Sequence, residues 1–398
     1  MRSRPAKIAI FGNFGMGNFG NEATLVAMLE SLRRSRSEIE LTCICTGPER
    51  VQREHQLVTL PLTRSAPSLI RKLDNILYAV QTIRKFDALL IPGTGILNDF
   101  TASPFGMPYT VFRWCLAAKL CGVKTAFVST GAGPSHHPVT RWLIKRSAAM
   151  AEYRSYRNKF SKNFLADLGL DTSHDQIYPD LAFSLTMPST SHTRSTDSAG
   201  LTVCVGAMLY HGWQGHLRTD DQVYRAYLGK LRDLALWLID QNYRVRLMMG
   251  DQNDETAVND LQQAIVAERP SLPDDRLIAE PARTYQDVIR QLSEADVVVS
   301  SRFHHLVFAV MLGKLTASLG YSPYHAELMD EMGLGAFCQH SDDIQLEKLI
   351  AQFNELTANR SHYQRLIGQA VSAAHEKLAD QEKILESRFL HPPLSGTG

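Results

Sequence analysis

The sequence predicts an α/β protein with two doubly wound, Rossmann-like domains that face a central cleft. Short apolar runs alternate with amphipathic stretches along nearly the whole chain, which is the pattern of strands connected by helices. A Ser/Thr-rich segment without an apolar run, 188–200, divides this alternation into two similar halves. The chain has 398 residues, of which 44% are hydrophobic, enough for more than one core. We expect domains over 1–187 and 201–343, a linker over 188–200 and a charged helical tail over 344–398.

In the first half, apolar runs that end at Gly, Pro or a Gly-rich turn predict strands at 7–11, 41–46, 87–92 and 125–129. Amphipathic stretches predict helices at about 22–34, 68–84, 110–121, 139–151 and 161–168. The second of these helices has apolar residues at helical spacing: Leu69, Leu73, Ile76, Leu77, Val80 and Ile83. Gly122 ends the third helix and Gly169 the fifth, because glycine readily adopts the backbone conformation that closes a helix.

The second half repeats the pattern. Strands are expected at 201–205, 244–249, 296–300 and 315–319, and helices at about 222–241, 255–267, 284–293 and 304–312. The tail from 344 to about 388 reads as mostly helical. In sheets of this kind, ligands bind beyond the carboxyl ends of the strands, so the loops that follow the strands are where we look for a site.

Charge and cysteine content exclude several classes of protein. The 42 Lys and Arg against 41 Asp and Glu leave a formal net charge of +1, which argues against a nucleic-acid binder. The six cysteines form no C-x-x-C pair, so we expect no disulfide framework, no zinc site and a reducing compartment. The apolar run after the basic start is too short for a signal peptide, and no stretch could span a membrane. We expect a cytoplasmic protein that could act at the inner face of the membrane on a lipid-linked substrate; its oligomeric state is left open.

The first predicted strand leads into a glycine-rich loop. Gly15-Met-Gly-Asn-Phe-Gly20 matches G-x-G-x-x-G, where glycines let backbone amides and a helix start face an anion. The acidic residue of a dinucleotide site is missing, since Glu40 begins the second strand and Glu49 lies beyond it. Three interpretations stay open: a turn without a ligand, a loop whose Asn18 and Gly20 contact an anion or a sugar, and a dinucleotide site that lacks this acidic residue. Asn21 and Glu22 could serve only as helix caps.

Arg302 and His304 follow the strand predicted at 296–300 and precede an apolar helix. This position places both side chains near the carboxyl edge of the second sheet. Arginine offers a fork of donors for carboxylate or phosphate, and histidine exchanges a proton near neutral pH. A structural ion pair for Arg302 and a backbone-bonded His304 are the alternatives. His305 is expected to face elsewhere. Asp251 and Asp254, after the strand predicted at 244–249, read as helix caps or as residues near the cleft.

Four segments in order resemble the polysaccharide pyruvyl transferase family. They are the loop Gly17-Asn-Phe-Gly-Asn-Glu-Ala23, the strand-to-glycine segment 87–97 with Gly93 and Gly95, the pair Tyr153–Ser161 and Pro179–Phe183, and the segment from Ser301-Arg-Phe-His304 to Leu334. The resemblance covers residues from about 8 to 335. It implies two domains like those of the GT-B glycosyltransferases.

The resemblance also implies a reaction. Members transfer pyruvate from phosphoenolpyruvate to two hydroxyls of a sugar as a ketal and release phosphate, with neither a metal nor a further cofactor. By carry-over, Arg302 and Arg157 would hold the donor and His304 would be the acid or base. Candidates for the loops and the saccharide acceptor are Asn18, Gly20, Asn21, Glu22, Gly93, Gly95 and Asp180. Two arginines and loop amides suit a donor with up to three negative charges.

The sequence departs from the family at two places. Asn158 stands where the family has Asp after the first arginine, and Tyr324-His325 stand where a Lys often follows Tyr-x-Pro. Two rivals therefore remain. One is a nucleotide-sugar glycosyltransferase, for which Glu327 is the nearest ribose-binding carboxylate. The other is a non-catalytic protein that binds a sugar or an anion.

Overall fold

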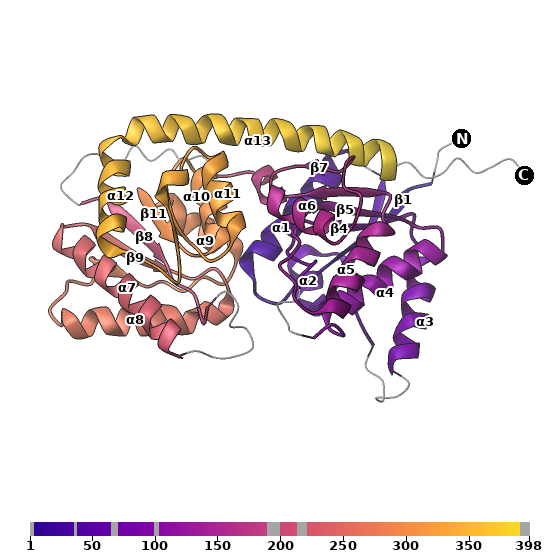
Figure 1. The fold of residues 1–398 in the computed structure, drawn as a ribbon, viewed down its shortest axis with the longest axis horizontal. Helices are drawn as coiled ribbons and strands as arrows, with labels where there is room; N and C mark the ends of the chain where they lie inside the picture. Colours follow the sequence, from indigo (N-terminus) through magenta and orange to yellow (C-terminus); the bar gives the residue numbers. More distant parts are fainter. Residues whose placement is uncertain are drawn as a thin grey trace, which may run out of the picture. The chain divides into compact units, whose positions relative to one another are not determined.

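The computed structural model describes residues 4–35, 38–64, 71–98, 103–188, 200–212 and 221–390. These residues form two compact α/β units (Figure 1). Unit 1 contains the chain up to Met16, Asn21–Leu185 and the chain from Ala374 onward, whereas unit 2 contains Gly17–Gly20 and Thr186–Ala373. Nearly all of the segment expected to be a linker lies outside the described residues. The predicted fold class, two doubly wound parallel-sheet units, is confirmed.

Unit 1 is built on a seven-stranded parallel sheet in the order β3-β2-β1-β4-β5-β6-β7. The four predicted strands are present. The sequence analysis missed β3, β6 and β7, which are short and less apolar. Chain order reverses between β1 and β4, and their loops diverge at this switch point. The strands are β1 (Ala6–Gly12), β2 (Ile39–Cys45), β3 (Val58–Pro61), β4 (Ala88–Pro92), β5 (Lys124–Thr130), β6 (Tyr153–Tyr156) and β7 (Gln176–Ile177).

Helices cover this sheet and supply its core. Trp114 is fully buried and packs against Phe11. Its indole N–H and the Arg113 guanidinium both donate to the Leu62 carbonyl, at 3.1 and 2.7 Å, which fastens one helix to the β3 end. The helices are α1 (Phe19–Ser35), α2 (Pro48–His55), α3 (Arg71–Ile83), α4 (Met107–Leu120), α5 (Pro138–Ala149) and α6 (Lys159–Asp167). The sequence analysis did not predict α2, and it began α1 three residues late.

Unit 2 has a six-stranded parallel sheet in the order β10-β9-β8-β11-β12-β13, with its switch point between β8 and β11. The short edge strands β10 and β13 were not predicted. The strands are β8 (Thr202–Gly206), β9 (Arg244–Met248), β10 (Leu277–Ile278), β11 (Val297–Ser300), β12 (Leu315–Gly320) and β13 (Cys338–His340). The helices are α7 (Asp221–Asp240), α8 (Glu255–Glu268), α9 (Tyr285–Ser293), α10 (Phe303–Met311) and α11 (Pro323–Glu331).

The predicted helical tail is two helices, α12 (Leu346–Ala358) and the 30-residue α13 (Arg360–Phe389). The second half of α13 belongs to unit 1. There Gln381 is buried and donates to Ser155 Oγ at 2.9 Å, while it accepts from Ser129 Oγ at 3.1 Å. This part of the tail therefore packs into unit 1. None of the described helices is both long and apolar enough to cross a bilayer.

Candidate functional site

Arg302 and His304 lie at the switch point of unit 2. The apolar run Val297–Ser300 forms β11 in the middle of the sheet, and α10 begins three residues after it ends. Arg302 is the N-cap residue of α10 and His304 lies in its first turn. The sequence therefore placed both residues correctly, at the carboxyl edge where α/β sheets bind ligands.

Asp254 holds Arg302 in place. Its carboxylate is fully buried and accepts from Arg302 Nε at 2.8 Å and also from Nη2. It accepts in addition from the backbone N–H groups of Leu209, at 3.2 Å, and Gly250, at 3.1 Å. Burial by itself would lower the pKa of Arg302, but the charge of Asp254 outweighs it and raises that pKa. The structural ion pair that the sequence analysis gave as an alternative for Arg302 is thus present. No described residue accepts a hydrogen bond from Nη1 of Arg302.

The glycine-rich loop contributes its second half to this site. Asn18 donates to Asp251 Oδ2 at 3.0 Å, and the Gln252 N–H donates to the Gly17 carbonyl at 3.1 Å. Gly20 lies against His304, because a Cβ atom built on Gly20 would stand 1.9 Å from His304 Nδ1. Unit 2 therefore brings together Asn18, Gly20, Arg302 and His304, four of the residues proposed from the sequence.

Two further histidines, His305 and His325, pack next to the residues of this site. His305 is buried, its Nε2 donates to the Met249 carbonyl at 3.2 Å, and its Nδ1 accepts from Ser300 Oγ at 2.9 Å. Burial lowers the pKa of His305 to about 4, so it stays neutral at pH 7. His325 donates to the Ser301 carbonyl at 3.2 Å and stacks on Tyr324 at 4.9 Å. The residues that replace the family's Lys therefore contact Ser301 and Phe303, the two neighbours of Arg302 in the chain.

The loops at the switch point of unit 1 are braced by the first turn of α1. Glu22 Oε1 accepts from the Gly15 N–H at 2.6 Å, and Asn21 Nδ2 donates to the Asn13 carbonyl at 3.1 Å. In the loop after β4, the Gly93 N–H donates to the Val128 carbonyl at 2.8 Å, and Asn98 donates to the Gly95 carbonyl. Asn21 and Glu22 lie inside the first turn and not at the N-cap, although Glu22 still places a carboxyl group near the positive end of the helix, as expected. They also hold the preceding loop.

Arg157 follows β6 at the same edge and pairs with Asp180 at 3.0 Å, both side chains being buried. The other Asp180 oxygen accepts from the Ala182 N–H at 3.0 Å and caps a 3-10 turn, Leu181–Ser184. Gly131 leaves room for the guanidinium, since a Cβ there would be 2.9 Å from Arg157 Nε. Both Asp180 oxygens already hold protein groups, so we assign this residue first to positioning Arg157.

The departure at Asn158 is structurally mild. Asn158 is the N-cap of α6, and its side chain accepts from the Ser161 N–H at 2.8 Å. Asp caps helices as well as Asn does, so either residue fits this position.

Arg157 belongs to unit 1 and Arg302 to unit 2. The clamp formed by these two arginines therefore stays a prediction.

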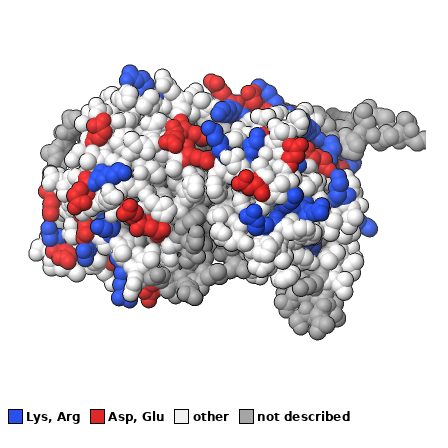
Figure 2. Space-filling view, in the orientation of Figure 1, with Lys and Arg blue, Asp and Glu red and all other residues white. Residues whose placement is uncertain are grey.

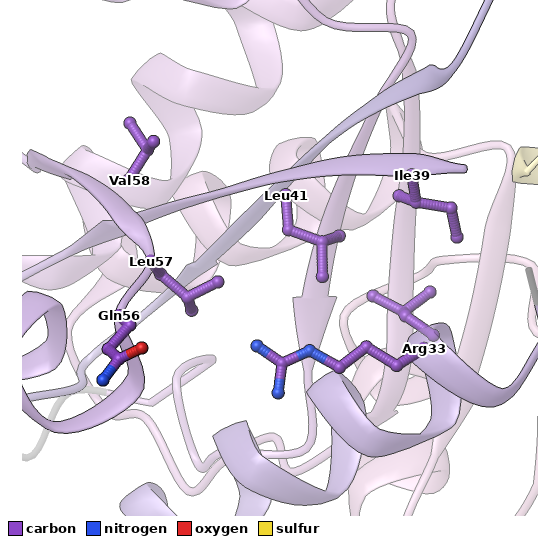
Figure 3. Close-up of a pocket in the computed structure, with 7 residues that line it drawn as sticks. Arg33, Ile39, Leu41, Gln56, Leu57 and Val58 are labelled. Atoms are coloured by element: carbon purple, nitrogen blue, oxygen red, sulfur yellow. The ribbon is translucent and has the colours of Figure 1, made fainter. Parts of the chain in front are cut away.

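A pocket of about 440 Å³ lies elsewhere on unit 1 (Figure 3). It is lined by the starts of β2 and β3 and the end of α1, including Arg33, Ile39 and Val58. These residues mark the amino edge of the sheet, opposite to the loops of the switch point. We therefore assign no catalytic role to this pocket.

Among the described residues, one group has the spacing of metal ligands. Ligand atoms of Glu22, Glu54 and His55 lie within 4.8 Å of one another. Arg50 Nε donates to Glu54 at 2.7 Å, so a cation already neutralises this carboxylate. We assign no metal role to the group.

Glu22 should make the stability of the protein depend on pH. Burial raises its pKa to about 7, although the Gly15 N–H opposes the shift. Because the folded state holds this proton more tightly than the unfolded state, Glu22 contributes its full stabilisation at pH values below the ordinary pKa of a glutamate. This stabilisation is lost as the pH rises through 7. We expect wild type to lose roughly 3 kcal/mol relative to Glu22→Gln between pH 5 and pH 8, measured by urea unfolding. Glu49→Gln, at an exposed position in α2, is the control. Parallel pH profiles for Glu22→Gln and wild type would contradict the prediction.

Comparisons with known proteins agree with this geometry. The family model described as polysaccharide pyruvyl transferase matches residues 18–323. No curated protein matches the chain significantly. Solved structures resemble its fold at low identity. A putative UDP-N-acetylglucosamine 2-epimerase from Listeria monocytogenes has 14% identity and a TM-score of 0.62, covering 96% of this chain and 97% of its own. HepE from Anabaena, in complex with UDP and glucose, has 13% identity and a TM-score of 0.64, covering 96% and 99%. Both show the two-unit architecture of the GT-B fold.

Proposed function

Because the chain belongs to the polysaccharide pyruvyl transferase family, we propose that it transfers the pyruvyl group of phosphoenolpyruvate to two hydroxyls of a saccharide. The product is a ketal and the released group is phosphate. One observation carries the proposal: Arg302, held by buried Asp254, lies at the switch point of unit 2, two positions before His304.

The carboxyl edge of the sheet in unit 2 offers positive groups for the anionic phosphoenolpyruvate. Asp254 occupies Nε and Nη2 of Arg302, while the side chain keeps 22% of its surface exposed. The Nη1 group can therefore donate to a carboxylate or phosphate oxygen of the donor. The N-terminus of α10 directs its positive end toward the same place. Arg157, which Asp180 positions in unit 1, is proposed as the second cation of the donor site.

The reaction needs proton transfer but no oxidant. A proton adds to the methylene carbon of the donor and makes it a methyl group, while two saccharide oxygens form bonds to the adjacent carbon. The bond from that carbon to the phosphate oxygen breaks. Of the two protons that the hydroxyls lose, one balances the new methyl group and the other leaves with phosphate. His304 is proposed as the acid or base in these steps.

Donor binding can be tested before the acceptor is known. We expect phosphoenolpyruvate to raise the unfolding temperature of the wild-type protein, since a ligand at 100 times its Kd adds about 2.7 kcal/mol of stability. Arg302→Ala should lose this shift. Arg283→Ala, an exposed arginine of the same unit paired with Glu255, should keep it. A shift that survives in Arg302→Ala would contradict the assignment of Arg302 to the donor.

Two other ligand responses would favour the rivals. A shift with UDP and none with phosphoenolpyruvate would favour a nucleotide-sugar transferase; the fold is compatible with it, and Glu327 of α11 is its candidate ribose ligand. Donor binding that His304→Ala leaves intact, together with no phosphate release from any saccharide mixture, would favour a non-catalytic binding protein.

A further inference from the structure

Helix α3 presents an apolar stripe to solvent. Leu73 is 67% exposed, Leu77 57% and Ile76 37%. With Val80 these residues follow the i, i+3, i+4, i+7 spacing that normally marks the face a helix buries. In this helix the buried side is instead formed by Asn75, Tyr78, Ala79, Thr82 and Ile83. Val80, near the end of the helix, packs against the core of unit 1, whereas Leu73, Ile76 and Leu77 stay exposed in the described part of the chain.

Helix α4 lies beside α3 and is also apolar on its outer side (Figure 1). Its inner side is buried and includes Trp114 and Cys115. Its outer positions, which are partly or largely exposed, are Tyr109, Phe112, Leu116 and Leu120, and Phe105 precedes them in the chain. A helix that is apolar all round normally lies inside a protein or against another apolar phase.

Helix α5 extends this surface on the other side of α4. Trp142 is 49% exposed and its ring lies 5.4 Å from that of Phe112. Val139 is exposed one turn earlier. We call the surface made by these three helices the outer helical face: Leu73, Ile76, Leu77, Phe105, Tyr109, Phe112, Leu116, Leu120, Val139 and Trp142. Exposed apolar side chains gathered on three neighbouring helices, with Phe112 and Trp142 in contact, indicate an interaction site.

The charges on these helices are almost all positive. Outside the core, α4 and α5 carry the basic residues Lys119, Arg141, Lys145 and Arg146 and no acidic residue, while α3 carries Asp74. Lys119 faces Glu152 at 3.9 Å. Figure 2 shows Lys and Arg side chains gathered over α4 and α5. Arg146 lies over the Trp142 ring at 5.8 Å. Within the described residues, Arg141, Lys145 and Arg146 form no ion pair, so their charges remain for a partner.

We propose that the outer helical face docks unit 1 onto an anionic lipid bilayer. Leucine and aromatic side chains would enter the boundary between headgroups and acyl chains, while the basic side chains contact lipid phosphates. A second copy of the chain is the less suitable occupant, because two faces of the same positive charge would repel each other. This inference goes beyond the proposed function and does not depend on the identity of the donor.

Vesicle binding tests the proposal with the full chain and without donor or acceptor. Wild type should sediment with vesicles of phosphatidylcholine mixed with phosphatidylglycerol roughly tenfold better than with phosphatidylcholine alone, and high salt should weaken the binding. The double variant Leu77→Glu/Trp142→Glu should lose this binding. So should Lys145→Glu/Arg146→Glu, which leaves the apolar side chains in place.

Matched controls lie on unit 2. Val266→Glu changes an apolar side chain of α8 whose exposed fraction, 44%, is similar to the 49% of Trp142. Lys230→Glu reverses an exposed charge on α7. Both controls should bind vesicles as wild type does, and all variants should unfold at the wild-type temperature. No binding by wild type, equal binding to neutral vesicles, or unchanged binding by Leu77→Glu/Trp142→Glu would overturn the proposal. A dimer that this double variant converts to monomer, without vesicle binding by wild type, would assign the face to a second copy.

Discussion

Replacement of Gly20 by alanine is expected to lower the rate of pyruvyl transfer by about 100-fold. The new Cβ would stand 1.9 Å from Nδ1 of His304 and 2.4 Å from its Cγ, so the ring has to move. His304 is the proposed acid or base, and a displacement of about 1 Å in such a group is enough for a loss of this size. Phosphate release, measured with an acceptor mixture on which wild type is active, gives the rate.

Gly229→Ala is the matched control. Gly229 lies in the middle of α7, and a Cβ built there meets no atom within 4 Å. This change should leave the rate unaltered and raise stability by about 1 kcal/mol, because alanine favours a helix more than glycine does. Wild-type activity in Gly20→Ala would show that the position of the His304 ring does not limit the reaction.

Replacement of Asp254 by alanine is expected to cost about 3–5 kcal/mol of stability. The change removes the only described carboxylate that pairs with Arg302 and leaves the N–H groups of Leu209 and Gly250 without their acceptor. The released guanidinium would also lose its orientation, so phosphoenolpyruvate binding should weaken together with stability. Urea unfolding measures the first effect, and the ligand-induced shift in unfolding temperature measures the second.

Asp233→Ala removes the carboxylate of another Arg–Asp pair in the same unit, but a half-exposed one. It should cost less than about 1 kcal/mol, since solvent screens such pairs. A loss of stability in Asp254→Ala no larger than that in Asp233→Ala would mean that Arg302 does not depend on Asp254 for its position.

The long apolar strands could be predicted because their signal is local. β1 from Ile8 onward, β4 and β11 are mostly apolar runs followed by turn residues, and the structure has all three. β6, with the sequence Tyr-Arg-Ser-Tyr, carries no such signal. It is a strand because it pairs with β5 and β7. The spacing in α3 predicted a helix correctly, but it could not show that Leu73 and Leu77 face outward.

The site was predicted in part for the same reason. Arg302 and His304 follow a recognisable strand, so their place at the edge of the sheet could be read from neighbouring residues. Asp254 was considered only as a cap or a residue near the cleft, because nothing local links it to Arg302, 48 positions away. The contact of Asn18 with Asp251 spans 233 positions and places the second half of the first loop in unit 2.

The long apolar strands, most of the helices between them and the residue types at the carboxyl edge of each sheet could be read from the sequence. These follow from apolar periodicity and from glycine at strand ends, which act over a few residues. The tertiary structure alone decided that Asp254 binds Arg302, that Gly20 lies against His304 and that the apolar stripe of α3 faces solvent. Such contacts depend on which distant segments the packing of each unit brings together, and no local preference encodes them.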